Sequence, residues 1–491
     1  MHQQVYHSRD IQAWEQRWFA QKNSSYGLMQ QAAWLITQQI VDVLKIKNIH
    51  NIAVCCGQGN NAGDGYLIAK YLKQLGFDVE IYKTELGSSK DLQLAYEEAQ
   101  DEKINIIQGF NFLKQYDCII DALFGIGLNR DLDKHWQGII KSINAHNALK
   151  IAIDIPSGLN ANTGRVMPCA IVADYTYTVL APKIGLYTGQ AKEYTGDIYT
   201  IPLIPKDEQL LSSATLSATN VNLPKRKAYA HKGNNGHVLV VGGHFEMGGA
   251  VIMAAEAAFA SGAGKVTVVC HENHHVAVLA RSPNIMLRDI NQLNGEKIFE
   301  LIEQVDAVCF GMGLGRDQWS KQIYEQWFEK LQKSKLEVVL DADALWFLAE
   351  NPEKVNERTY LTPHPGEAAK LLNLSTLEIE TDRVRAIQKL KEKYQGQWVL
   401  KGSGSLVLDD QLWICNVGNA GMATGGMGDI LSGMIASLKA QYKQELRLDQ
   451  IVTLHARAGD LLAENGVHGI QAQHMVNAIY QVINNKEHTN D

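Results

Sequence analysis

A glycine-rich stretch near the C-terminus contains a single carboxylate and could support phosphate chemistry. It reads Asn419-Ala-Gly-Met-Ala-Thr-Gly-Gly-Met-Gly-Asp429-Ile-Leu-Ser-Gly433 and leads into an apolar run at helical spacing. Glycines let backbone N–H groups converge on an anion, and the positive end of a helix dipole strengthens that attraction. A phosphate bound there would repel Asp429, unless this carboxylate accepts the proton of an attacking hydroxyl. The alternative is a tight turn in which Asp429 only caps the helix.

A second loop of the same half also has the composition of an anion site. It reads Lys401-Gly402-Ser403-Gly404-Ser405 and follows a strand-like apolar run. One cation, glycines and hydroxyls suit a phosphate. His364 lies in a loop flanked by prolines, where contact with a ligand is more frequent than on an apolar face. Two anion loops and Asp429 together suit phosphoryl transfer from a nucleotide.

In the first half, three apolar strand-like runs, which begin at Asn51, Cys118 and Lys150, end in polar, glycine-rich turns that carry Asp or Asn. Parallel strands end at one edge of a sheet, where ligands bind, so we expect these side chains to converge. Hard oxygen ligands of this kind can hold a cation, and a remaining carboxylate can move protons. The alternative is that each residue caps the next helix. The set is Asn60, Asn61, Asp64, Asp121, Asp154 and Ser157.

Composition limits the classes of function. The 491 residues exceed the size of one ordinary core, so two α/β domains are expected, with a boundary near residue 212 in an exposed connection spanning 204 to 224. A net charge of -7 without basic blocks argues against nucleic acid. Seven scattered cysteines and no long apolar run predict a cytoplasmic protein that does not bind membranes. The pattern His271-Glu272-Asn-His-His275 matches a zinc-protease motif but lacks an obvious third ligand.

Five motifs in this order resemble those of the bifunctional NAD(P)H-hydrate repair enzymes, and together they span nearly the whole chain. They are Gly-Gln-Gly-Asn-Asn-Ala-Gly-Asp-Gly (57–65), Asp-Ile-Pro-Ser-Gly-Leu-Asn (154–160), His-Lys-Gly-Asn-Asn-Gly-His (231–237), Pro-His-Pro-Gly-Glu (363–367) and Gly-Met-Ala-Thr-Gly-Gly-Met-Gly-Asp (421–429).

The resemblance implies two fused enzymes. Residues 1–212 would be a Rossmann-like three-layer domain that interconverts the R and S forms of hydrated NADH and NADPH. Residues 213–491 would be a ribokinase-like α/β domain that dehydrates the S form with ADP as co-substrate, releasing AMP and phosphate. A homo-oligomer, a K⁺ ion in the first domain and Mg²⁺ in the second are also expected.

The resemblance also assigns site residues. In the first domain the hydrate would contact Asn60, Asn61, Ala62, Gly63 and Asp64 and the run Gly125, Ile126, Gly127, Leu128, Asn129, Arg130 and Asp131. Asp154 would be the acid/base there, and Asn61, Asp121 and Ser157 would hold potassium. In the second domain Ala250, Gly313, His364 and the catalytic Asp429 would face the hydrate. Lys401, Gly402, Ser403, Gly404, Ser405 and Gly428 would hold the adenine nucleotide, and Asp341 or Asp343 could hold magnesium through water.

The chain departs from the family pattern at four positions. Gln58 and Met312 replace proline, Ala62 replaces glycine, and Gln30 replaces glutamate. Ala62 is the departure of most consequence, because alanine would be strained if the loop needs a left-handed residue there. The first half could then be impaired as an epimerase.

Two other classes of function remain open from the sequence. The first is an ATP-dependent kinase of the ribokinase type, which would leave a stable phosphorylated product. The second is a non-catalytic adenylate sensor, which would bind nucleotide without turnover.

Overall fold

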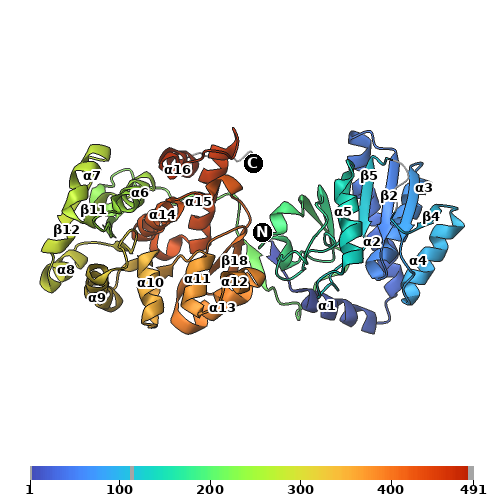
Figure 1. The fold of residues 1–491 in the computed structure, drawn as a ribbon, viewed down its shortest axis with the longest axis horizontal. Coiled ribbons are helices and arrows are strands. Elements are labelled where there is room, and N and C mark those ends of the chain that lie inside the picture. The colour runs from blue at the N-terminus through green and yellow to red at the C-terminus, as the bar shows by residue number, and fades with distance from the viewer. Residues whose placement is uncertain (1–2, 111–114, 485–491) are drawn as a thin grey trace. The chain divides into compact units, whose positions relative to one another are not determined.

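The computed structural model describes residues 3–110 and 115–484 (Figure 1). The chain divides into two compact units, Gln3–Thr215 and the residues from Leu216 onward. Each unit is an α/β fold built on a largely parallel sheet, so the expected fold class is confirmed. No helix among the described residues has both the length and the apolar composition needed to cross a membrane.

The sheet of the first unit is parallel throughout, with strand order β4-β3-β2-β5-β6-β7-β8. The chain moves outward from β2 to β4 and then returns to β5 beside β2, which makes this pair the topological switch point. The strands are β2 (Asn51–Cys56), β3 (Asp78–Lys83), β4 (Asn105–Gln108), β5 (Cys118–Ala122), β6 (Leu149–Ile153), β7 (Tyr175–Val179) and β8 (Asp197–Ile201). A short strand β1 (Gln4–Val5) pairs antiparallel with β9 (Ala214–Leu216).

Helices cover both faces of this sheet. One apolar core joins it to α2, α3 and α4, and a second joins it to α5, which gives the three layers. The helices are α1 (Ser8–Ala20), α2 (Ser25–Ile46), α3 (Asn60–Gln74), α4 (Lys90–Asp101) and α5 (Lys134–Ala145), with 3₁₀ turns η1 (Ile184–Leu186) and η2 (Ala191–Glu193).

The second unit repeats this plan with the strand order β18-β17-β16-β15-β14-β13-β10-β11-β12. Neighbouring strands are parallel from β16 across β15, β14, β13, β10 and β11 to β12. The strand β17 runs antiparallel to both of its neighbours, β16 and β18. The switch point lies between β10 and β13. The strands are β10 (His237–Val241), β11 (Lys265–Cys270), β12 (Met286–Asp289), β13 (Ala307–Phe310), β14 (Glu337–Leu340), β15 (Val355–Leu361), β16 (Gln395–Leu400), β17 (Ser405–Leu408) and β18 (Leu412–Cys415).

The largest apolar core of this unit lies between the sheet and α6, α14, α15 and α16. The helices are α6 (Gly248–Ala260), α7 (His275–Arg281), α8 (Gly295–Ile302), α9 (Gln318–Lys333), α10 (Asp343–Glu350), α11 (Pro365–Leu372), α12 (Thr376–Thr381), α13 (Arg383–Tyr394), α14 (Met427–Tyr442), α15 (Leu448–Ala463) and α16 (Met475–Asn484). Six 3₁₀ turns are η3 (Lys232–Asn235), η4 (Glu272–His274), η5 (Ile290–Gln292), η6 (Ala420–Met422), η7 (Lys443–Glu445) and η8 (Ala472–His474).

The prediction that residues 204–224 form an exposed connection is partly wrong. Residues 214–216 form β9 and are buried, because Ala214 and Leu216 have apolar side chains that the surrounding polar residues masked in the pattern.

Candidate active sites

The first candidate site is a cavity of about 490 Å³ at the carboxyl ends of β2, β5, β6 and β7. The predicted convergence is therefore seen in the structure. Residues predicted to contact a ligand that line this cavity are Asn60, Asn61, Asp64, Asp154 and the run from Gly125 to Arg130.

Two glycines allow the chain to pass closely around this cavity. A Cβ atom at Gly57 would lie 2.0 Å from the carbonyl oxygen of Leu123, and one at Gly65 would lie 2.6 Å from the Cβ of Ala122. The loop after β2 and the helix α3 can therefore approach β5 only with glycine at these positions. This close packing carries Asn60, Asn61 and Asp64 to the cavity wall.

Asp154 is the most constrained residue of the cavity. It adopts a φ of +68°, which is unfavourable for any residue other than glycine and is typical of functional sites. Its Oδ1 accepts hydrogen bonds from the Nζ of Lys183 at 2.5 Å and from the backbone N–H of Val179 at 3.3 Å, and its Oδ2 accepts one from the N–H of Ile126 at 3.2 Å. Lys183 is 1% exposed. Asp154 is therefore held as one half of a buried ion pair.

Two further carboxyl groups face the same cavity. Burial, together with the nearby charge of Asp154, holds the pKa of Asp64 well above its usual range. Burial and Asp154 also raise the pKa of Glu15, which α1 contributes to the wall. The cavity thus combines an ion-paired carboxylate with carboxyls that favour the protonated form, an arrangement suited to paired base and acid roles.

The three residues predicted to hold potassium lie beside this cavity and are buried. Asp121 accepts hydrogen bonds from the Ser157 hydroxyl at 2.6 Å and from the Ser157 N–H at 2.8 Å, while burial raises its pKa to about 6. In the described part of the chain, the buried amide nitrogen of Asn61 has no hydrogen-bond partner. Because amide orientation follows the surrounding contacts, a bound cation would favour turning the Asn61 oxygen inward. These oxygen donors fit a hard monovalent cation.

The remaining residues predicted to contact the hydrate in the first unit, Ala62, Gly63 and Asp131, do not line the cavity. Ala62 and Gly63 are buried in the first turn of α3, and the Asp131 carboxylate pairs with Arg165 at the surface. Ala62 is helical and is not among the residues with positive φ. The concern about strain at Ala62 is therefore removed, because alanine suits a helix better than glycine does.

The second candidate site forms at the start of α14. As expected, the glycine-rich stretch leads into this helix, with Gly426 at its N-cap at φ +92° and Asp429 in its first turn. Close packing with α6 requires Gly433, where a Cβ would lie 2.1 Å from the carbonyl oxygen of Ala254. One turn further, the Ser437 hydroxyl donates to the carbonyl of Ala258.

This register extends toward the N-termini of both helices. Ala250 lies in the first turn of α6, and Asp429 lies in the first turn of α14. Gly313, at φ +57° after β13, lies next to Ala250, since a Cβ on Gly313 would be 3.3 Å from the Ala250 Cβ. Ala250 and Gly313, two of the residues predicted to face the hydrate, are therefore adjacent near the switch point of the second sheet.

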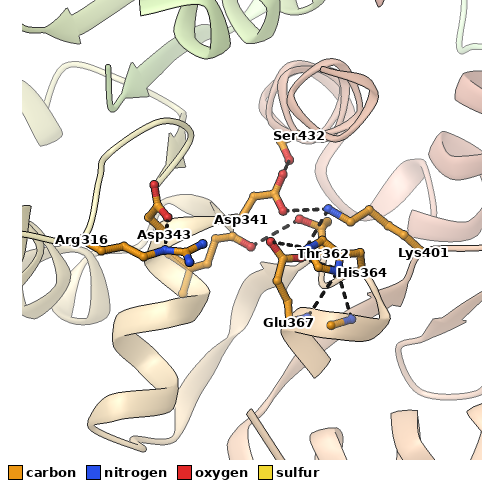
Figure 2. A network of polar contacts seen from close by, with 10 residues as sticks. Arg316, Asp341, Asp343, Thr362, His364, Glu367, Lys401 and Ser432 are labelled. Carbon is orange, nitrogen blue, oxygen red and sulfur yellow. Dashed lines mark hydrogen bonds and ion pairs between the residues drawn. The ribbon is translucent and has the colours of Figure 1, made fainter. Parts of the chain in front are cut away.

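A polar network links the ends of β14, β15 and β16 to α14 (Figure 2). The Lys401 Nζ lies 3.0 Å from Asp341 Oδ1 and 3.7 Å from Glu367 Oε2. The Ser432 hydroxyl donates to the other oxygen of Asp341 at 2.8 Å. A Cβ at Gly428 would lie 3.1 Å from Lys401 Nζ, so the start of α14 and this lysine are adjacent.

Burial and neighbouring charge set the protonation of this network. Burial, followed by the charge of Asp341, raises the pKa of Asp429 to about 7. Burial likewise raises the pKa of Glu367 to about 7. Burial alone would lower the pKa of Lys401, but Asp341 and Glu367 outweigh it and the net shift is upward. Lys401 therefore stays charged, while Asp429 can exchange a proton near neutral pH.

His364 and the loop from Lys401 to Ser405 lie at the edge of this network. His364 caps α11, where its Nδ1 accepts from the N–H groups of Gly366 and Glu367, and burial lowers its pKa. The loop joins β16 to β17, and the Ser405 hydroxyl donates to the Gly402 carbonyl at 2.9 Å. Gly402 and Ser403 are exposed, whereas Gly404 is buried.

The two acids suggested as magnesium holders already have protein partners. Asp341 is held by Lys401 and Ser432, and Asp343 accepts from the Gly315 N–H at 2.8 Å and from Arg316 Nε at 2.7 Å. No group of three or more histidine, cysteine or acidic side chains suited to a metal occurs within residues 3–110 and 115–484. The zinc-protease pattern is not realised, since His271 lies in the turn before α7.

The sequence reasoning missed several site residues. Lys183 and Glu15 lie outside the recognised motifs, although a lysine in the loop that follows a strand such as β7 was a usable signal. Arg316, which is fixed by Asp343 and stacked on Trp346 with its guanidinium carbon 4.2 Å from the ring centre, had no signal in the pattern.

Comparison with known proteins agrees with a chain of two units. Residues 238–481 match the family model described as NAD(P)H-hydrate dehydratase, and residues 25–185 match the model described as YjeF-related protein N-terminus.

The chain is 38% identical over 479 residues to a bifunctional NAD(P)H-hydrate repair enzyme of Coxiella burnetii, covering 94% of this chain and 95% of that protein. It is 36% identical over 446 residues to the Escherichia coli protein of the same name, covering 88% and 84%. A ribokinase-like superfamily protein from Enterococcus faecalis is 29% identical with a TM-score of 0.49, covering 53% of this chain and 90% of that chain. The chain therefore belongs to the family of bifunctional NAD(P)H-hydrate repair enzymes.

Proposed function

We propose that this protein repairs hydrated NADH and NADPH with two separate active sites. Residues 1–212 epimerise the R and S forms, and residues 213–491 dehydrate the S form with ADP, releasing AMP and phosphate. The observation that carries the second activity is Asp429, a half-buried carboxyl whose pKa is raised to about 7, set at a glycine-rich helix start beside Lys401.

The epimerisation follows from the chemistry of the hydrate. Hydration of a dihydronicotinamide places the hydroxyl on the ring carbon next to nitrogen, because that carbon best supports positive charge. Asp64, whose raised pKa favours its protonated form, donates a proton to this hydroxyl, which leaves as water while the nitrogen lone pair forms a C=N bond. Water then adds to the other face and loses its proton to Asp154, which Lys183 holds in place.

Potassium would be held by Asn61, Asp121 and Ser157. It would supply a fixed positive charge beside the cavity and favour the ionised form of Asp121. The hydrate itself would contact the run from Gly125 to Arg130, whose backbone borders the cavity.

Dehydration needs a better leaving group than hydroxide. Asp429 accepts the proton of the substrate hydroxyl as its oxygen attacks the β-phosphorus of ADP, and the bond from that phosphorus to AMP breaks. The new phosphate ester then leaves as phosphate, and loss of a proton from the adjacent ring carbon restores the dihydronicotinamide.

The groups around Asp429 have matching roles. Ala250, Gly313 and His364 would border the hydrate, and the Lys401–Ser405 loop with Gly428 would bind the nucleotide. Lys401 provides the fixed positive charge opposite the phosphates. Because Asp341 and Asp343 are already paired, magnesium would be held mainly by the nucleotide phosphates and water, which is its usual preference.

Product stoichiometry tests this proposal. Purified S hydrate with ADP and magnesium should yield NADH, AMP and phosphate in equal amounts, followed by absorbance and nucleotide chromatography. A stable phosphorylated product formed with ATP would indicate the kinase alternative, and nucleotide binding without NADH formation would indicate the sensor. R hydrate should also be consumed completely by the parent protein.

A further inference from the structure

A fully buried arginine lies directly beneath the Lys401–Ser405 loop. Arg383 is the first residue of α13, and its side chain is 1% exposed. Burying a guanidinium costs free energy unless its N–H groups find hydrogen-bond acceptors and its charge is balanced by a negative group. Its contacts therefore indicate what this position requires.

The guanidinium holds the backbone where the strand becomes the loop. Its Nη2 donates to the carbonyl oxygens of Leu400 and Lys401, both at 3.1 Å. Gly402 rests directly on it at a φ of +141°, and a Cβ there would lie 2.8 Å from both terminal nitrogens. Arg383 thus fixes the peptide groups on both sides of Lys401, and the close contact with its guanidinium selects glycine at position 402.

The charge of Arg383 is only partly compensated. Its Nη1 lies 3.1 Å from Glu380, whose side chain is 41% exposed and so screened by water. Glu380 is its only ion-pair partner in the described ranges, where its Nε also has no hydrogen-bond partner. A positive charge therefore remains beneath a loop in which Gly402 and Ser403 are exposed.

We propose that Arg383 is a positioning residue for nucleotide binding, which holds the Lys401–Ser405 loop and adds positive charge beneath it, and that Glu380 attenuates this charge. This inference rests on the proposed assignment of the loop to the nucleotide phosphates. Arg383 touches no reacting atom, so its effect belongs to ADP affinity and not to the chemical step.

Glu380 gives the sharpest test, because charge and structure predict opposite signs. Glu380→Gln keeps a hydrogen-bonding side chain but removes the negative charge, so ADP should bind about 2- to 3-fold more tightly, as expected for a partly screened pair. Binding of uncharged adenosine should not change. A purely structural role predicts unchanged or weaker ADP binding in this variant, because Arg383 would be less well held. The matched control is Glu392→Gln, because Glu392 is an exposed carboxylate on α13, the helix that begins at Arg383.

Arg383 itself gives the second test. Arg383→Lys keeps the charge but loses the planar fork that reaches two carbonyls, so the KM for ADP should rise by about 3- to 10-fold while kcat stays within about 2-fold. Arg383→Met should raise KM further, by about 30-fold or more. Should these variants fail to fold, Glu380→Gln decides alone.

The measurement is calorimetric titration of the full-length proteins with ADP and magnesium, and with adenosine, alongside steady-state NADH formation. Tighter ADP binding by Glu380→Gln, with adenosine and Glu392→Gln unchanged, supports the inference. Unchanged or weaker ADP binding by Glu380→Gln, or a loss in kcat without a change in KM for Arg383→Lys, overturns it while the parent still uses ADP. A parent protein that neither binds nor uses ADP overturns the proposed function, and this inference with it.

Discussion

The two sites use the same arrangement of charges on two different sheets. In the first unit, buried Lys183 pairs with Asp154, and Asp64 nearby has a raised pKa. In the second unit, Lys401 pairs with Asp341, and Asp429 nearby has a raised pKa. Each set lies at the carboxyl ends of parallel strands, where ligands bind in folds of this class.

The difference between the two sites lies in what surrounds the pair. The first pair faces a cavity lined by side chains and the Gly125–Arg130 backbone. The second pair lies between a glycine-rich helix start and the Lys401–Ser405 loop, which we propose bind phosphate. With the roles proposed above, the comparison teaches that one lysine–aspartate pair would serve proton transfer alone in one unit and proton transfer coupled to a phosphoryl group in the other.

The largest expected effect separates the two functions at Asp429. Asp429→Asn should reduce ADP-dependent dehydration by about 10²- to 10⁴-fold, the usual contribution of a general base, while epimerisation continues. NADH absorbance with S hydrate measures the loss. Asp410→Asn, an exposed acid between β17 and β18, should behave like the parent. Dehydration by Asp429→Asn within about 10-fold of the parent would remove Asp429 as the base.

The reverse separation is expected at Lys183. Lys183→Met removes the hydrogen bond and the ion pair that hold Asp154 in the cavity, so epimerisation should fall by about 10²-fold. Chiral chromatography of the hydrates measures this rate, and dehydration of S hydrate should not change. Lys134→Met, at an exposed lysine, is the control. Equal losses in both activities would show that Lys183 serves folding and not the cavity.

Lys401, unlike Lys183, is expected to affect the binding of the phosphates of ADP. Lys401→Met is expected to raise the KM for ADP by about 10-fold or more, since a charge-assisted contact is lost. It also removes a charge that lowers the pKa of Asp429, so the pH midpoint of dehydration should move upward. Initial rates over ADP concentration and pH test both effects, and an unchanged midpoint would contradict the electrostatic coupling.

The pH dependence of the parent should follow Asp429. The base must be ionised, and its pKa is raised to about 7, so the ionised fraction falls as the pH drops below 7. The kcat/KM of dehydration should therefore fall about 10-fold between pH 6 and pH 5, and it should level off above pH 8. A profile that is flat from pH 5 to pH 8 would exclude a base of this pKa.

The smallest effect concerns Ala62, which the family pattern marks as unusual. Because Ala62 is helical, Ala62→Gly should lower the free energy of unfolding by about 0.5–1 kcal/mol and leave epimerisation unchanged. Denaturant unfolding and the epimerase assay test this. Faster epimerisation by the Ala62→Gly variant would show that the alanine does impair this half of the protein.

Local sequence patterns predicted much of this molecule. The glycine-rich run before Asp429 does lead into a helix, and the polar residues after β2, β5 and β6 do converge, because strand ends in a parallel sheet share one edge. Periodicity and turn residues suffice for such features.

The missed residues depend on tertiary contacts. Lys183, Glu15 and Arg383 reach their sites from elements distant in sequence, and their burial comes from packing that no local pattern encodes. The concern over Ala62 failed for a related reason, since the helix α3 begins earlier than the glycine pattern indicated. The loop ends at Gly59, six residues before the last glycine of the motif, Gly65.

Mixing two singly disabled proteins tests the central claim, that one chain carries two independent sites. Asp154→Asn alone should stall once the S form of a mixed hydrate is consumed, apart from slow spontaneous epimerisation. Asp429→Asn alone should epimerise without forming NADH. Combined with ADP and magnesium, the two should restore complete recovery of NADH absorbance. Failure of the mixture, with each variant folded, would contradict two separable activities.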